Sequence, residues 1–214
     1  MAKRSPAREK AQDRGNGVFW IDHATIVGTD RAWLEGAERM TLWNVVVPDG
    51  FLADLPKLWW LDLRGGTASD LRVARGCAHL RYLQVNQVRG LGDLGALSEH
   101  ASLELLSLYG LAQVRTLPSL RSLTKLKRMQ IGQMRNLPML GAALDAPHLE
   151  ELLLSKRVGV SESDLERINS HPAIKAFYWN VEDVAASRFE PILARIALPS
   201  ASVMHPEAWM GVPR

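Results

Sequence analysis

Apolar residues recur along much of the chain in a six-residue pattern. The first, fourth and sixth residues of the pattern are apolar, and the second, third and fifth vary. All eighteen apolar positions of the six copies are occupied by apolar residues, and successive copies begin 22, 23, 23, 23 and 25 residues apart. The copies begin at Leu58, Leu80, Leu103, Leu126, Leu149 and Ile174, and a weaker copy begins at Ala37. The alternating end of each unit predicts a short strand with its apolar side chains on one face. The constant spacing predicts a repeat protein in which these strands stack.

The segments between the predicted strands return the chain to the next strand, and three of them carry an apolar residue at about every third position. These residues are Val88, Leu91, Leu94 and Leu97, then Leu111, Val114, Leu117, Leu120 and Leu123, then Met134, Leu137 and Leu140. A step of three favours 3-10 turns or irregular coil over a long α-helix. Two returns, 69–75 and 161–169, have a more helical pattern, and the second begins with a Ser-x-x-Asp sequence typical of a helix N-terminus.

The repeated L-x-x-L-x-L core resembles the leucine-rich-repeat family, in its short-repeat bacterial or intracellular type with about 22 residues per turn, over residues 37–182. The resemblance implies a right-handed α/β solenoid with a curved parallel β-sheet of six to eight strands, short 3-10 or helical returns and terminal caps. The family's Asn or Cys, three residues after the third Leu, is absent here. Its positions hold Gly66, Val88, Leu111, Met134, Arg157 and Glu182. We therefore expect apolar burial to replace the family's Asn ladder in the middle turns.

The flanks of the repeats are suited to closing the two ends of a solenoid, which otherwise expose core and strand edges. We expect one domain over 18–198, composed of an N-terminal cap (18–36), the repeats (37–182) and a C-terminal cap (183–198) that forms an amphipathic helix broken or started by Pro191. Residues 1–17 contain almost no apolar residues and are expected to be a disordered basic tail. Residues 199–214 are expected to be an irregular tail that Trp209 anchors.

The charge of the chain is unevenly distributed, although its sequence pI is about 9.2. Residues 1–17 carry five basic and two acidic side chains, whereas the other 197 residues carry 21 of each. No acid occurs from 105 to 144, a basic belt flanked by segments of net charge −3 (18–104) and −4 (145–190). The belt contains Arg115, Arg121, Lys125, Lys127, Arg128 and Arg135. Such a belt between acidic ends favours an acidic protein partner.

Several function classes have no support in the sequence. The N-terminus lacks the apolar region of a signal peptide, no segment is apolar enough to span a membrane, and the single cysteine, Cys77, has no partner, so we expect a cytoplasmic protein. The chain has no G-x-S-x-G, P-loop, H-E-x-x-H or C-x-x-C motif. His79 and His148 share a repeat position but lie three turns apart, roughly 14 Å, which is too far to share a metal ion. We therefore expect a protein that is not an enzyme and has no metal or cofactor.

The variable positions of the repeats identify the candidate contacts. The third and fifth positions of each unit, and the residue directly after the unit, called the seventh position, point away from the core. They form the concave face, where Trp, Tyr and Arg would dominate binding. The candidate partner contacts are Trp60, Tyr82, Tyr109, Arg128, Tyr178, Arg64, Asn86 and Lys127. An alternative is that the protein's own terminal segments cover Trp60 or Leu105 on this face. The second positions alternate in charge from Arg81 to Lys175, which predicts cross-strand charge pairs that fix the register.

These observations predict a non-enzymatic module that binds an acidic protein partner through its concave face. The family resemblance implies an adaptor or an immunity-type inhibitor that blocks its partner. The alternative is a nucleic-acid-binding protein that uses the basic tail and the basic belt at 105–144 together.

Overall fold

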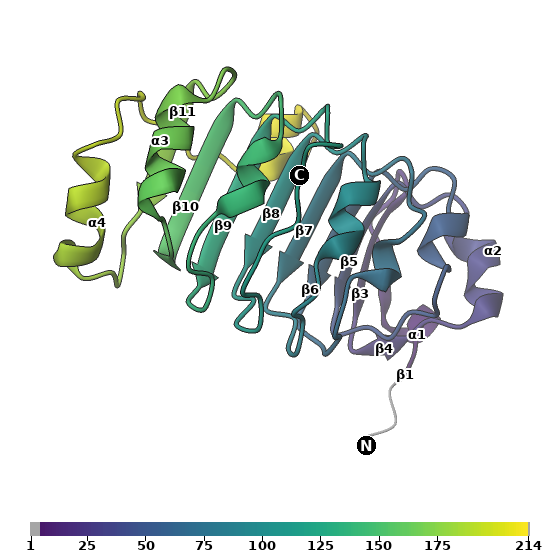
Figure 1. The fold of residues 1–214 in the computed structure, drawn as a ribbon. Coiled ribbons are helices and arrows are strands. Elements are labelled where there is room, and N and C mark those ends of the chain that lie inside the picture. Colours follow the sequence, from purple (N-terminus) through teal and green to yellow (C-terminus); the bar gives the residue numbers. More distant parts are fainter. Residues whose placement is uncertain (1–4, 214) are drawn as a thin grey trace.

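A computed structural model describes residues 5–213, and its main feature is a nine-stranded sheet with the order β11-β10-β9-β8-β7-β6-β5-β3-β2 (Figure 1). All neighbouring strands are parallel except β2 and β3, which are antiparallel. The strands are β2 (Ala11–Asp13), β3 (Val18–Asp22), β5 (Arg39–Trp43), β6 (Trp60–Arg64), β7 (Tyr82–Asn86), β8 (Leu105–Tyr109), β9 (Arg128–Met134), β10 (Glu151–Val158) and β11 (Ala176–Asn180). The predicted α/β solenoid is confirmed, and eight of the nine strands form its parallel part.

Equivalent positions of the repeat face one another across the whole sheet. Leu61 pairs with Leu83, Leu83 with Leu106 and Leu106 with Met129, so each repeat position forms a column. The period of two along each strand therefore sends one set of columns into the core and the other set to the opposite face.

The returns between strands are short, as the step of three predicted. They contain η2 (Leu52–Asp54), η3 (Arg72–Ala74), η4 (Gly95–Glu99), η5 (Gly141–Asp145) and α3 (Glu162–Ser170). Ser161 caps the N-terminus of helix α3: its hydroxyl accepts a hydrogen bond from the Asp164 backbone N–H at 3.2 Å, which confirms the predicted cap. The return at 69–75, predicted to be more helical, holds only the three-residue 3-10 turn η3.

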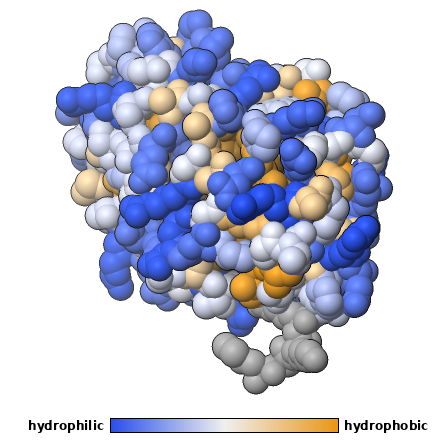
Figure 2. All heavy atoms as spheres, turned by 90° about the vertical axis from the view of Figure 1, so that its right-hand side faces the viewer, coloured by the Kyte–Doolittle hydropathy of each residue, from blue (hydrophilic) through white to orange (hydrophobic). Residues whose placement is uncertain are grey.

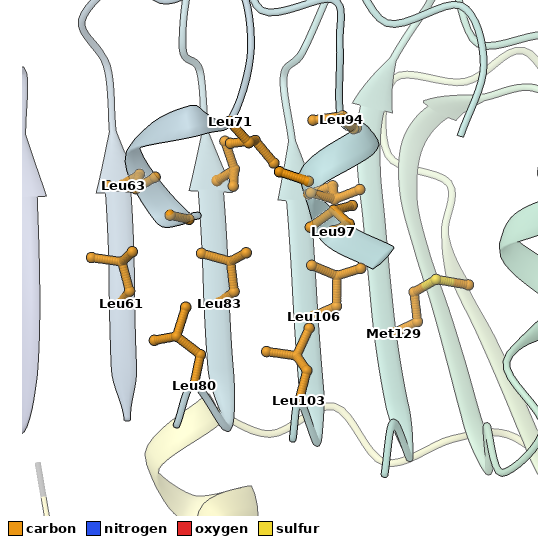
Figure 3. Close-up of a cluster of buried hydrophobic side chains, with 14 of the residues drawn as sticks. Leu61, Leu63, Leu71, Leu80, Leu83, Leu94, Leu97, Leu103, Leu106 and Met129 are labelled. Carbon is orange, nitrogen blue, oxygen red and sulfur yellow. The ribbon is translucent and has the colours of Figure 1, made fainter. Parts of the chain in front are cut away.

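The core lies between the sheet and the returns (Figure 3). Leu61, Leu83 and Leu106 point from their strands toward leucines of the returns such as Leu97, and all four side chains are fully buried. At the positions where the leucine-rich-repeat family has its Asn ladder, Val88, Leu111 and Met134 are also buried, as expected. Apolar packing thus joins successive turns.

Main-chain hydrogen bonds between successive turns form a ladder at the bends after β5, β6, β7 and β8, which was not predicted from the sequence. From Asn44 to Lys156 the residue after each seventh position adopts a left-handed conformation, and the first four of these residues donate their N–H to a carbonyl of the next turn. Gly65 donates to Asn86 O at 2.8 Å, Gln87 to Tyr109 O at 2.8 Å and Gly110 to Gly132 O at 2.9 Å. Glycine relieves the cost of positive φ at only some of these positions, since Asn44, Gln87, Gln133 and Lys156 adopt it too.

The N-terminal residues differ from the expected disordered tail. Residues 5–13 form β1 (Ser5–Pro6), α1 (Ala7–Lys10) and β2, which pairs with β3, and the side chain of Ala7 is fully buried. Residues 1–4 of that predicted tail lie outside the described residues. Short elements, β4 (Ala24–Thr25), η1 (Gly28–Asp30) and α2 (Arg31–Leu34), complete this end. Its surface is mostly hydrophilic with scattered apolar patches (Figure 2), as a terminal cap requires. Composition alone missed these elements because main-chain pairing to an existing edge strand requires few apolar side chains.

At the other end, α4 (Ala186–Leu193) contains Pro191 within the helix, and Phe189 and Ile192 pack against the core. The chain then pairs Ser200 with Phe177 of β11 and turns across the sheet. Residues 199–213, called the C-terminal segment below, include the short helix α5 (Pro206–Met210). In Figure 1 this yellow helix lies on the side of the sheet opposite the returns. None of the helices within residues 5–213 has the length and apolar character that crossing a membrane requires.

Candidate functional site

The face of the nine-stranded sheet that points away from the core and the returns is called the outer sheet face. Three columns of side chains cross it, at the third, fifth and seventh positions of each repeat. The third-position column runs through Arg39, Trp60, Tyr82, Leu105, Arg128 and Glu151. The seventh-position column runs through Trp43, Arg64, Asn86, Tyr109, Gly132 and Ser155.

The third-position column is covered by the C-terminal segment. Trp60 is 5% exposed and Tyr82 1% exposed, and their rings lie 3.8 Å apart between centroids at an angle of 32°. Trp209, Met210 and Val212 pack onto them and onto Leu105. The expectation that Trp60 and Tyr82 are accessible partner contacts is therefore wrong for this conformation, because the chain's own end removes their apolar area from water. The alternative that a terminal segment covers Trp60 and Leu105 is correct.

Arg128 is also buried, with no exposed surface, so it is not accessible either as a partner contact or as part of the basic belt. Its guanidinium forms an ion pair with Glu151 on the neighbouring strand and donates a hydrogen bond of 2.9 Å to the Ser202 carbonyl. It also lies 6.0 Å from the centroid of the Trp209 ring. Its Nε atom has no hydrogen-bond partner among the described residues. A buried guanidinium needs a nearby anion to offset its lost hydration, and the carboxylate of Glu151, in the same column, is that anion.

The seventh-position column remains accessible and forms the candidate binding surface. Trp43 is 43% exposed, and Arg64, Asn86 and Tyr109 are half-buried. The Tyr109 ring lies against Gly132, where a β-carbon would be only 2.6 Å from the ring. We call Trp43, Arg64, Asn86 and Tyr109 the seventh-position strip. It contains three of the eight predicted contacts, namely Arg64, Asn86 and Tyr109.

The N-terminal end of this strip is a cluster of two tryptophans and two arginines. The Trp20 and Trp43 rings meet edge to face at 6.1 Å, and Arg14 and Arg64 lie 5.0 and 5.3 Å from the Trp20 ring. Cation–π contacts of this kind hold both arginines in place on the surface. Trp20, Trp43 and Arg14 were not among the predicted contacts. Trp43 occupies the seventh position of the weak repeat that begins at Ala37, so applying the repeat template to that copy identifies it.

A pocket of about 430 Å³ lies between this cluster and α5. Asp62 in its wall is 3% exposed and accepts a hydrogen bond of 2.8 Å from Arg64, yet its Oδ1 atom has no partner among residues 5–213. Burial raises the pKa of Asp62, opposing the effect of Arg64, and the nearby Glu207 carboxylate raises it further. Burial likewise raises the pKa of Tyr82. The pocket wall also contains Arg14, Arg39 and Arg64, so three cationic side chains face the two acidic ones, Asp62 and Glu207.

The remaining predicted contacts lie elsewhere. Tyr178 is half-buried on β11 at the far end of the sheet. Lys127 is exposed in the second-position column, beside Glu150, whose pKa is lowered by Lys175 and, to a smaller degree, by Lys127. In this column Arg81 pairs with Glu104 at 2.7 Å and Lys175 with Glu150 at 2.8 Å, which confirms two of the predicted cross-strand charge pairs.

Within residues 5–213, no group of three or more His, Cys, Asp or Glu side chains is arranged to hold a metal ion. A scan against protein-family models and a search of curated proteins found no match to this chain.

Proposed function

We propose that the chain is a non-enzymatic leucine-rich-repeat protein that binds a protein partner through the seventh-position strip of its outer sheet face. The six-fold L-x-x-L-x-L pattern on parallel strands supports the family assignment. The cluster of Trp20, Trp43 and Arg64 carries the functional proposal, because tryptophan and arginine on a preformed, partly exposed surface are the residues that dominate binding energy at protein interfaces.

The rigidity of the seventh-position strip supports a role in protein binding. Trp43 and Arg64 stand on neighbouring hydrogen-bonded strands, and Arg64 is held by both Asp62 and the Trp20 ring. A surface ordered before binding loses little side-chain entropy when a partner docks. An adaptor or an immunity-type inhibitor would use such a surface in the same way, by binding a folded protein tightly.

The nucleic-acid alternative has less support than the protein-binding proposal. Arg128 is buried and ion-paired, so it cannot contact phosphate in this conformation. The other belt residues are exposed but lie on different parts of the surface. Arg121 and Lys125 lie on a return, whereas Lys127 lies in the second-position column beside the sheet. Nucleic-acid affinity normally requires a continuous basic track, often with aromatic residues interleaved.

The proposal is tested by affinity capture from the native host with the full chain as bait, followed by mass spectrometry and by binding measurements on the captured protein. We expect Trp43→Ser combined with Arg64→Ala to weaken binding at least tenfold. Met139→Ser is the matched control, because Met139 is 46% exposed but lies on the return after β9. Equal binding by the double variant and the wild type would contradict the proposal. Capture that disappears after nuclease treatment would favour the nucleic-acid alternative.

A further inference from the structure

The pocket of about 430 Å³ on the outer sheet face is lined by elements from both ends of the chain. The turn between β2 and β3 forms one side, strands β5, β6 and β7 form the floor, and the start of α5 forms another side. Thr41, Asp62 and Gln84 in the floor pair in register and form the fifth-position column. This column separates the covered third-position column from the accessible seventh-position strip. A partner on the strip therefore reaches the pocket with the C-terminal segment in place.

Arg14 reaches this pocket from the turn between β2 and β3. Its backbone N–H donates to the Val18 carbonyl at 2.9 Å, and the Val18 N–H donates to the Gly15 carbonyl at 3.0 Å. The guanidinium lies 5.0 Å from the centroid of the Trp20 ring. Its only hydrogen bond within residues 5–213 is one of 3.4 Å to the side chain of Gln12, and it forms no ion pair there. Most of its N–H groups are therefore available to a ligand.

Arg39 lines the same pocket from the start of β5. Its backbone N–H donates to the Gly17 carbonyl at 3.0 Å, which fixes the strand beside the turn. Its guanidinium lies 6.0 Å from the Trp60 ring and donates a hydrogen bond of 2.8 Å to the Pro213 carbonyl. This acceptor is neutral, and Arg39 forms no ion pair with any described residue. Its positive charge is thus held in place without an anion beside it.

The third guanidinium, that of Arg64, already has its anion. Arg64 pairs with Asp62 at 2.6 Å, and Asp62 and, to a smaller degree, Glu207 raise the pKa of Arg64. Both carboxylates that line the pocket therefore act on Arg64, and they leave Arg14 and Arg39 without a counter-charge. A carboxylate accepts hydrogen bonds from two guanidiniums at once, so the two unpaired arginines favour a carboxylate as the ligand.

We propose that this pocket binds the carboxylate of an aspartate or glutamate side chain of the protein partner, which accepts hydrogen bonds from Arg14 and Arg39. This inference rests on the proposed function and names the chemistry of the partner, an acidic side chain beside the surface that contacts Trp43 and Arg64. Positive charge at this position also speeds the approach of an acidic protein. A nucleic acid matches the pocket less well, because its successive phosphates would meet the Glu207 carboxylate.

The experiment measures binding of the full chain to an acetylated and amidated hexaglutamate peptide, with hexaglutamine as the uncharged probe. We expect Arg14→Gln to weaken hexaglutamate binding about tenfold, because it removes an unpaired guanidinium. We expect Glu207→Gln to strengthen it about threefold, because it removes a competing negative charge. Arg115→Gln is the matched control. Arg115 is exposed on the return after β8, so this variant makes the same charge change far from the pocket and should bind as the wild type does.

Nuclear magnetic resonance of the unmodified chain gives a reading that does not depend on any variant folding. Hexaglutamate should shift the side-chain Nε–H signals of Arg14 and Arg39 and leave that of Arg115 in place, and hexaglutamine should shift none of them. Three results would each overturn the inference. They are equal hexaglutamate binding by Arg14→Gln and wild type, weaker binding by Glu207→Gln, and tighter binding of a hexathymidylate oligonucleotide than of hexaglutamate at Arg14.

This experiment and the test of the proposed function give separable results. The peptide assay depends on Arg14 and Arg39, whereas the capture test depends on Trp43 and Arg64. Hexaglutamate binding that requires Arg14, without capture of any partner, would support the pocket and reject the proposed function. Partner capture that requires Trp43 but is unchanged in Arg14→Gln would support the proposed function and overturn this inference.

Discussion

Arg128 on β9 and Ser202 in the C-terminal segment are joined by a hydrogen bond of 2.9 Å from the guanidinium to the main-chain carbonyl. The two residues are 74 positions apart in the sequence. Arg128 is completely buried, and its guanidinium also donates a hydrogen bond to Glu151, while its Nε atom has no partner among the described residues. This contact changes a predicted surface residue into an internal one that helps to hold the C-terminal segment on the sheet.

Replacing Glu151 and replacing Arg128 should destabilise the folded protein to different degrees. Glu151→Ala leaves a fully buried guanidinium without its anion, and we expect a loss of about 3 kcal/mol in the free energy of unfolding. Arg128→Met removes the buried charge itself and leaves Glu151, whose side chain is 27% exposed, able to contact water. Its cost should be about 1 kcal/mol. Denaturant unfolding of both variants measures the difference.

The matched control for this pair is Arg81→Met. Arg81 also pairs with a glutamate on the next strand, Glu104, but its side chain is 48% exposed, so the loss should be about 0.5 kcal/mol. If Arg128→Met proved more damaging than Glu151→Ala, the unpaired buried guanidinium would not be the main cause of the instability.

Gly159 follows β10 at a point where no side chain fits. A β-carbon there would lie 2.3 Å from the Leu137 carbonyl oxygen and 2.5 Å from main-chain atoms of Pro138. Since these neighbours are backbone, they cannot rotate away, and we expect Gly159→Ala to destabilise the fold by about 1–3 kcal/mol. Gly28→Ala is the control, because nothing lies within 4 Å of its β-carbon position. Thermal melts that shift equally for the two variants would show that the close approach at Gly159 is not real.

Stability should fall in mildly acidic solution because of His100. This side chain is 2% exposed, and burial lowers its pKa below the usual value of 6.5. The native state therefore keeps the imidazole neutral while the unfolded chain takes up a proton below pH 6.5. Unfolding should become easier as the pH falls from 6.5 toward the folded pKa, by up to about 1.36 kcal/mol per pH unit. The pKa of His171 is lowered in the same way and adds to the slope.

The measurement is the free energy of unfolding between pH 7.5 and 5.0 for the wild type and His100→Gln. We expect the variant to lose part of the pH dependence, while His148→Gln, at an exposed position, keeps the wild-type slope. A His100→Gln variant with an unchanged slope would indicate that His100 takes up its proton equally in both states.

Cys77 should be unreactive in the folded protein. Its side chain is buried, and burial raises its pKa to about 12 from an ordinary value of 9.0. At a given pH below 9 the thiolate is therefore about a thousandfold rarer than for a free cysteine, and the thiolate is the form that reacts. Labelling with a thiol-specific disulfide reagent should be slow in native buffer and fast in denaturant. Native labelling at the rate of a free thiol would contradict this placement.

The repeated units made the architecture predictable. Leu61, Leu83 and Leu106 occupy the same position of a fixed pattern, and equal spacing permits only one register in which all of them reach the core. The cap of α3 was predictable because Ser161 and Asp164 act locally. The left-handed residues after each strand were not recognised, since Gln87 and Lys156 are not residue types that favour that conformation.

The candidate site was predictable only in part, because the outer sheet face is completed by a contact over long sequence distance. The repeat template correctly placed Arg64, Asn86 and Tyr109 on this face. It could not show that Trp60, Tyr82 and Arg128 are covered, since Trp209 belongs to a segment without periodicity and its docking depends on the assembled sheet. Trp43 was missed because its repeat unit matches the template weakly.

Whether a protein partner binds across the outer sheet face, as we claim, can be measured by hydroxyl-radical footprinting of the chain with and without its captured partner. Trp43 and Met139 are similarly exposed, at 43% and 46%, so both are oxidised readily in the free chain. We predict that partner binding lowers the oxidation of Trp43 several-fold and leaves that of Met139 unchanged. Protection of Met139 with unchanged oxidation of Trp43 would place the partner on the returns and contradict the claim.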